Sequence, residues 1–212
     1  MRIALIHALR HSPPPVEASF ARLWPEATLM NLLDDSLSAD LAAAGRITDD
    51  ITRRFLDLSG YVLSTGADAI LFTCSAFGPC IEACVAKFPG VPILKPNEAM
   101  IEEAAGIAKR IGLLASFAQT LDSMPREFPA GMQVVTQLAE GALAALDRGD
   151  GPLHDQLAAQ AAGKLADGGV EVIALAQFSL ARAADAVAAA TGLRVLTTPD
   201  CAVRKMRLLL RV

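Results

Sequence analysis

The chain has 212 residues, 53% of them hydrophobic, and a formal net charge of −4 at pH 7. Its length and hydrophobic content fit one large domain or two small lobes with a substantial core. It has no basic run and no interleaving of basic and aromatic residues, so nothing in the composition points to nucleic-acid binding. The longest segment without a charged residue, 69–81, has 13 residues, whereas a membrane-spanning helix needs roughly 20.

Short apolar runs alternate with longer alanine-rich stretches of helical period. Runs that are apolar throughout are typical of parallel strands covered by helices on both faces, so the pattern predicts an α/β layered fold. Three residues offer side-chain oxygens suited to helix N-caps: Thr48, Asn97 and Ser116. In chain order, we expect strands at 3–6, 27–32, 69–73, 93–94, 111–115, 132–135, 170–175 and 195–196.

The second half of the chain repeats the order of elements in the first. Arg2 and Arg110 open similar apolar runs 108 positions apart, and each half has a strand end followed 22 positions later by a proline, Pro96 or Pro199. We therefore expect two pseudo-symmetric lobes, residues 1–97 with 200–212 and residues 98–199, each a mostly parallel sheet flanked by helices. The active-site cleft is expected between the lobes, at the carboxyl ends of the strands.

The first of these strand ends carries a thiol. Cys74 lies between a predicted strand and a helix that begins near Ala76, so we expect helix N-terminal amides to lower its pKa and to stabilise a thiolate. The flanking Thr73 and Ser75 offer hydroxyls to a substrate carboxylate at the same place. The alternative is that the thiol packs in the core and the hydroxyls only cap the helix.

Cysteine and glycine spacing argue against a metal or a cofactor. The four cysteines lack C-x-x-C spacing, and the three histidines are far apart, so we expect free thiols and no zinc site. Neither Gly-x-Gly-x-x-Gly nor a P-loop is present, and the working model needs no cofactor. The first residues do not resemble an export signal, which favours a cytoplasmic protein. His11 and His154 are expected at the surface.

Four segments together resemble the aspartate/glutamate/hydantoin racemase superfamily, and their order runs through nearly the whole chain. They are Thr73-Cys-Ser-Ala-Phe-Gly78, Pro96-Asn-Glu-Ala-Met100, Ile111-Gly-Leu-Leu-Ala-Ser116 followed by Thr120, and Leu175-Ala-Gln-Phe-Ser179. The resemblance implies a cofactor-independent, homo-oligomeric isomerase with a small carboxylate substrate between two lobes. In the racemases of this superfamily, a cysteine from each lobe faces the substrate α-carbon.

Cys74 matches the first of these cysteines, whereas the second position falls at or beside Gln177. A glutamine side chain does not cycle a proton near neutral pH, so symmetric two-thiol racemisation is not available to this chain. We expect Cys74 to act as the acid–base thiol, with His7, which ends the first strand, as its candidate partner. The residues expected to hold the substrate are Thr73, Ser75, Ser116, Thr120, Gln177 and Ser179.

Other readings remain open for these residues and for the reaction. His7 and Gln177 could instead satisfy backbone groups, and Ser116 could be a helix cap. By resemblance to arylmalonate decarboxylases and maleate cis-trans isomerases, the chain could be a single-cysteine decarboxylase or a cis-trans isomerase acting on a dicarboxylate. A third possibility is a non-catalytic carboxylate-binding protein.

Overall fold

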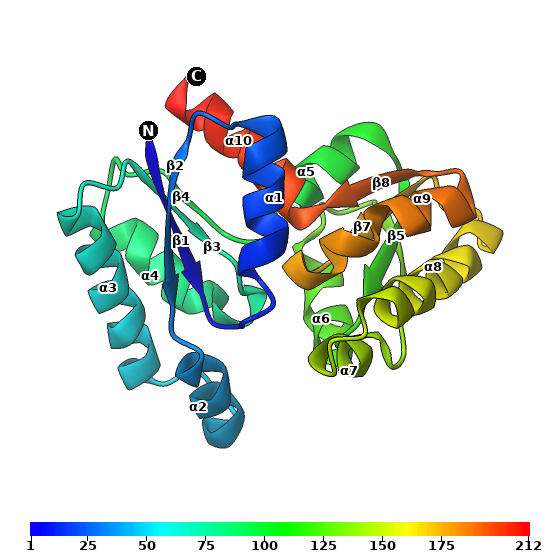
Figure 1. Cartoon of the computed structure of the whole chain (residues 1–212), viewed down its shortest axis with the longest axis horizontal. Coiled ribbons are helices and arrows are strands. Elements are labelled where there is room, and N and C mark those ends of the chain that lie inside the picture. The colour runs from blue at the N-terminus through cyan, green and yellow to red at the C-terminus, as the bar shows by residue number, and fades with distance from the viewer. The chain divides into compact units, whose positions relative to one another are not determined.

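The computed structural model describes residues 1–212, whose contacts divide between two units (Figure 1). The first unit contains Met1–Pro96 together with Ala202–Val212, and the second contains Asn97–Cys201. The final helix, α10 (Thr198–Leu210), therefore begins in the second unit and continues into the first.

The first unit is built on a four-stranded parallel sheet in the order β2-β1-β3-β4. Its strands are β1 (Arg2–His7), β2 (Thr28–Leu33), β3 (Ala69–Phe72) and β4 (Ile93–Leu94). The other elements are α1 (Pro13–Leu23), α2 (Ser36–Ala44), α3 (Asp49–Ser64), the 3-10 helix η1 (Ser75–Phe77) and α4 (Gly78–Lys87).

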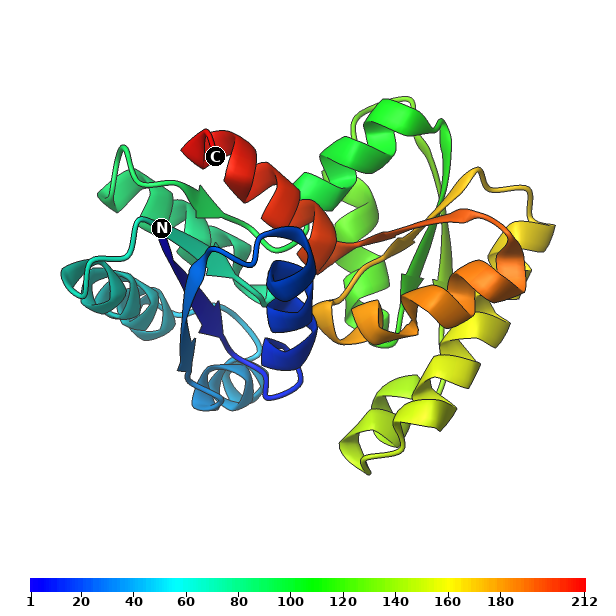
Figure 2. The same ribbon diagram turned by 45° about the horizontal axis from the view of Figure 1, so that its top comes forward.

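Helices cover both faces of this sheet, as the apolar runs predict (Figure 2). Ala4 and Ile6 of β1 belong to a buried cluster with residues of α3 and α4, whereas the alternate residues Ile3 and Leu5 are equally buried on the other face. There α10 lies beside α1, and Arg207 Nη1 donates a hydrogen bond of 2.7 Å to the carbonyl oxygen of Leu23.

The second unit repeats this topology with the strand order β6-β5-β7-β8, again all parallel. Its strands are β5 (Arg110–Ala115), β6 (Gln133–Leu138), β7 (Val172–Leu175) and β8 (Arg194–Thr197). The other elements are α5 (Glu98–Ile107), α6 (Ala118–Ser123), the 3-10 helix η2 (Met124–Glu127), α7 (Ala142–Asp147), α8 (Gly151–Asp167), the 3-10 helix η3 (Phe178–Ala183) and α9 (Ala184–Thr191).

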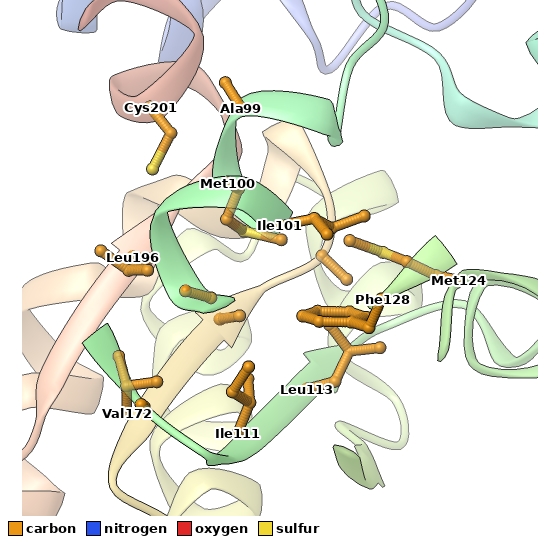
Figure 3. Close-up of a cluster of buried hydrophobic side chains, with 14 of the residues drawn as sticks. Ala99, Met100, Ile101, Ile111, Leu113, Met124, Phe128, Val172, Leu196 and Cys201 are labelled. Carbon is orange, nitrogen blue, oxygen red and sulfur yellow. The ribbon is translucent and has the colours of Figure 1, made fainter. Parts of the chain in front are cut away.

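Two apolar layers enclose the second sheet. On one face, Ile111, Leu113 and Val172 pack under α5, with Met124 and Phe128 beside them (Figure 3). On the other face, Leu114, Ile173 and Leu175 pack under α7, α8 and α9. This confirms the predicted α/β class, with two parallel sheets each flanked by helices. All eight strands lie at the apolar runs, with ends that differ by a few residues.

The predicted helix caps are only partly correct. Thr48 caps α3, because its side chain accepts a hydrogen bond of 3.2 Å from the amide of Ile51. Asn97 precedes α5 without a side-chain capping bond. Ser116 is not a cap, since Phe117 occupies the position before α6 and the Ser116 side chain binds elsewhere. None of the helices combines the length and the apolar character that crossing a bilayer requires.

Candidate active site

In each unit the strand order reverses between two central strands, β1 and β3 in the first and β5 and β7 in the second. Ligands of open α/β sheets bind outside the carboxyl ends of the strands at such a reversal. The structure brings most of the predicted site residues to these two strand ends. His7 ends β1, and Thr73 to Ser75 follow β3, while Ser116 follows β5 and Gln177 follows β7.

Cys74 lies between β3 and η1 and has an extended backbone conformation, with φ −127° and ψ 116°. Its side chain is half-buried and packs against the apolar cluster under α3 and α4, whereas the next residue, Ser75, is exposed. Burial raises the pKa of the Cys74 thiol, and a hydrogen bond from the backbone amide of Ala76 only partly opposes this. The predicted lowering of this pKa was wrong, because the cost of desolvating a thiolate exceeds the gain from one amide. Cys74 therefore starts as a neutral thiol.

His7 is completely buried, and both of its ring nitrogens have partners. Nδ1 lies 2.8 Å from Thr73 Oγ1, and Nε2 lies 2.9 Å from Asn31 Oδ1. Burial lowers the pKa of His7, against opposing contributions from the bond to Asn31 and the charge of Glu17. The imidazole is thus held neutral beside the residue that precedes Cys74.

Gln177 is oriented by the end of the neighbouring strand. Its Oε1 accepts hydrogen bonds from the backbone amide of Ser116, at 2.6 Å, and from the Ser116 hydroxyl, at 3.1 Å. Because the carbonyl end of the carboxamide is occupied by these two bonds, its Nε2 hydrogens are the groups directed away from Ser116. Both residues are half-buried, so the pair is partly open to solvent.

Cys74 and Gln177 occupy the same place in the two repeated units. Each is the second residue after the third strand of its sheet, and each is an extended residue directly before a 3-10 helix. Gln177 has φ −141° and ψ 145°, close to the backbone conformation of Cys74. A carboxamide thus stands in the second unit where a thiol stands in the first.

The remaining predicted residues are less closely tied to these strand ends. Thr120 is buried within α6, and Ser179 is half-buried in η3. The prediction that His154 lies at the surface was wrong. It is fully buried on α8, where Nδ1 lies 2.8 Å from Asp155 Oδ1, and Arg182 binds the same carboxylate through two nitrogens.

The other thiols are separate from these strand ends. Cys80 and Cys84 are buried on α4, and all four cysteines are free. No group of three or more histidine, cysteine, aspartate or glutamate side chains is arranged to hold a metal ion. Sequence reasoning did not identify Asn31 or Glu17, which lie outside the recognised segments. The only feature of the sequence that points to this pair is Asn31 itself, a polar residue within the otherwise apolar run 29–33.

A family model described as Asp/Glu/Hydantoin racemase matches residues 16–206. No curated protein sequence matches the chain. Among solved structures, the chain is similar to allantoin racemase from Klebsiella pneumoniae, with a TM-score of 0.76, 15% identity, and coverage of 100% of this chain and 88% of that one.

Two further structures show the same fold. An aspartate racemase homologue from Pyrococcus horikoshii gives a TM-score of 0.72 at 13% identity, with 99% of both chains covered. Glutamate racemase from Francisella tularensis, solved in complex with D-glutamate, gives a TM-score of 0.71 at 11% identity, with 99% of this chain and 81% of that chain covered.

Proposed function

Because the chain belongs to the Asp/Glu/hydantoin racemase family, we propose that it is a cofactor-independent isomerase in which the thiol of Cys74 transfers a proton at the α-carbon of a small carboxylate substrate. The observation that carries this assignment is the position of Cys74. It follows β3, at the point where the strand order of its parallel sheet reverses. The same residue is half-buried and is followed by the exposed residues Ser75 and Ala76.

In this proposal, Gln177 binds an oxygen of the substrate. The two bonds from Ser116 fix its Oε1, so its amide hydrogens are free to donate to a carboxylate or to the enediolate that forms when the α-proton leaves. Ser116 then acts by orienting Gln177. Ser75, Thr120 and Ser179 remain candidates for further contacts with the substrate.

A single thiol changes what the reaction can be. For racemisation, the Cys74 thiol first loses its proton to solvent. The thiolate then takes the α-proton, and the electron pair of the broken Cα–H bond passes into the carboxylate to give an enediolate. A proton returned from the same sulfur restores the original configuration. Inversion therefore requires a proton from water on the opposite face, because Gln177 does not supply one.

The protonated state of Cys74 favours a second candidate function. A thiol whose pKa is raised by burial starts the reaction as a proton donor. In a decarboxylation, the substrate's second carboxylate leaves as carbon dioxide, and the neutral thiol protonates the remaining enediolate. A dicarboxylate decarboxylase needs only this one donor. A cis-trans isomerase would instead need the thiolate, which forms a C–S bond with an alkene and leaves again after rotation about the former double bond.

The test is proton exchange at the α-carbon, followed by NMR in D₂O with amino acids, 5-substituted hydantoins and 2-substituted malonates as separate substrates. The native enzyme is expected to exchange the α-proton of one class, and Cys74→Ala is expected to lose this activity. Equal exchange by both would remove the thiol from the mechanism. Carbon dioxide released from a malonate, without exchange of the amino acids, would select the decarboxylase.

Cys80→Ala is the matched control. Cys80 lies six positions from Cys74 on α4, and its sulfur is 3.6 Å from the Thr52 hydroxyl. This variant removes a thiol from the same region but leaves Cys74 in place, so it should retain exchange. Ligand-dependent thermal stabilisation without turnover of any substrate would instead support a carboxylate-binding protein.

We also propose that the enzyme is cytoplasmic and homo-oligomeric. The four free thiols suit a reducing compartment. Light scattering of the purified protein measures the oligomeric state, and a monomer at working concentration would contradict this part of the proposal.

A further inference from the structure

A chain of hydrogen bonds runs from the surface of the first unit to the residue before Cys74. Asn31 Nδ2, on β2, donates to Glu17 Oε1, on α1, at 2.6 Å. Asn31 Oδ1 lies 2.9 Å from His7 Nε2, and His7 Nδ1 lies 2.8 Å from Thr73 Oγ1. Four side chains from separate segments thus form one continuous path.

The carboxylate at the start of this path fixes the direction of every bond in it. An ionised carboxylate only accepts hydrogen bonds, so Asn31 must present its amide nitrogen to Glu17 and its oxygen to His7. His7 Nε2 must then carry the proton. This leaves Nδ1 of the neutral ring as an acceptor. The Thr73 hydroxyl therefore donates its one hydrogen to Nδ1, at 2.8 Å, in preference to the carbonyl oxygen of Ile6, which lies 3.4 Å away.

The inner end of the path is buried and mechanically coupled to the site. His7 is 0% exposed and Thr73 is 5% exposed, so neither can exchange its partner for water without opening the structure. The backbone amide of Thr73 also binds the carbonyl of Ile6, at 3.1 Å. Thr73 is therefore fixed through both its backbone and its side chain, and it is bonded covalently to Cys74.

We propose that Glu17 and Asn31 are positioning residues, which act through His7 and Thr73 to hold the turn that presents Cys74. His7 serves here as a fixed hydrogen-bonding link, since neither ring nitrogen is left over for a substrate. The effect on activity rests on the proposed function of Cys74, but the geometry can be tested without any substrate.

The first measurement is a long-range ¹H–¹⁵N NMR spectrum of the histidine rings in the native protein. The chain has three histidines, and the His7 signals are those missing from His7→Phe. We expect His7 to be neutral with the proton on Nε2. A proton on Nδ1, or an even mixture of the two tautomers, would overturn the proposal.

The second measurement compares variants of the outer residues. Glu17→Ala and Asn31→Ala are expected to increase the Nδ1-protonated form and to speed alkylation of Cys74 by iodoacetamide about fivefold, the factor that corresponds to one hydrogen bond of ordinary strength. Glu17→Gln keeps an acceptor oxygen, so its His7 tautomer and its rate of Cys74 alkylation should both match those of the native protein. Glu26→Ala, which removes an exposed carboxylate just beyond α1, is the control and should change neither.

These outcomes separate the two proposals. Unchanged tautomer and alkylation in Glu17→Ala would overturn the positioning role whatever the enzyme does with substrates. The expected NMR and alkylation results, in a protein that exchanges no α-proton, would instead retain the positioning of Cys74 and reject its proposed reaction. In an active enzyme, kcat should fall in Glu17→Ala and recover in Glu17→Gln.

Discussion

The pair formed by Ser116 and Gln177 allows structural and functional roles to be separated by substitution. Ser116→Ala removes only the hydroxyl bond of 3.1 Å and keeps the backbone amide bond of 2.6 Å, so it should lower the free energy of unfolding by about 1 kcal/mol. Gln177→Ala removes both bonds and leaves a half-buried amide without this partner. It should cost about 2 kcal/mol.

Gln177→Glu is the informative third variant. A carboxylate still accepts from the Ser116 amide and hydroxyl, so the free energy of unfolding should stay within about 0.5 kcal/mol of the native value. The variant replaces the two amide hydrogens with a negatively charged oxygen. It should therefore repel a substrate carboxylate and raise KM, although the protein remains as stable as the native one.

The assay combines denaturant unfolding with thermal unfolding, in which about 1 kcal/mol corresponds to a Tm shift of roughly 2–4 °C for a chain of this size. Steady-state exchange kinetics on the same samples give KM. The reasoning would be refuted if Gln177→Ala were no less stable than Ser116→Ala. It would also be refuted if Gln177→Glu bound the carboxylate as well as the native enzyme does.

Three further predictions concern packing and pH. A methyl group at Gly112 would lie 3.0 Å from Val170 Cγ2 and 3.1 Å from Leu165 Cδ1. Gly112→Ala should therefore lower the free energy of unfolding by about 1–3 kcal/mol in a denaturant titration. An unchanged free energy of unfolding would contradict the close packing of α8 on β5. Because burial lowers the pKa of His7, the unfolded chain binds more protons than the folded chain below about pH 6.5. The free energy of unfolding should therefore fall with decreasing pH in that range. His7→Phe should reduce this dependence of the free energy of unfolding on pH. Because burial raises the pKa of Cys74, the rise of its alkylation rate with pH should occur at higher pH than for a free cysteine. A rise at lower pH than for a free cysteine would instead support the lowered pKa predicted from the sequence.

The eight strands and the repeat could be predicted because they depend on local composition. A parallel strand buried on both faces requires a run that is apolar throughout, so runs such as Ile3–Ile6 and Ile111–Ala115 report burial directly. The cap at Thr48 depends on a partner three residues away. The superfamily resemblance likewise rests on short segments and their order, and the family match confirms it.

Contacts between distant segments could not be predicted in the same way. Ser116 has a plausible local role as a helix cap, but the order of β5 and β7 in the sheet places it beside Gln177, 61 positions away. His7 finds Thr73 and Asn31 only because β1 lies between β2 and β3.

Local composition is enough to predict the strands of this protein, the repeat of its two halves and a thiol at a strand end. The state of the chemical groups at those strand ends depends instead on tertiary contacts. The pKa of Cys74 depends on the apolar cluster that desolvates it, and the burial of His154 depends on the packing of α8. Desolvation and hydrogen-bond direction are set by neighbours that strand order and register bring together, and a linear pattern of residue types does not encode these neighbours.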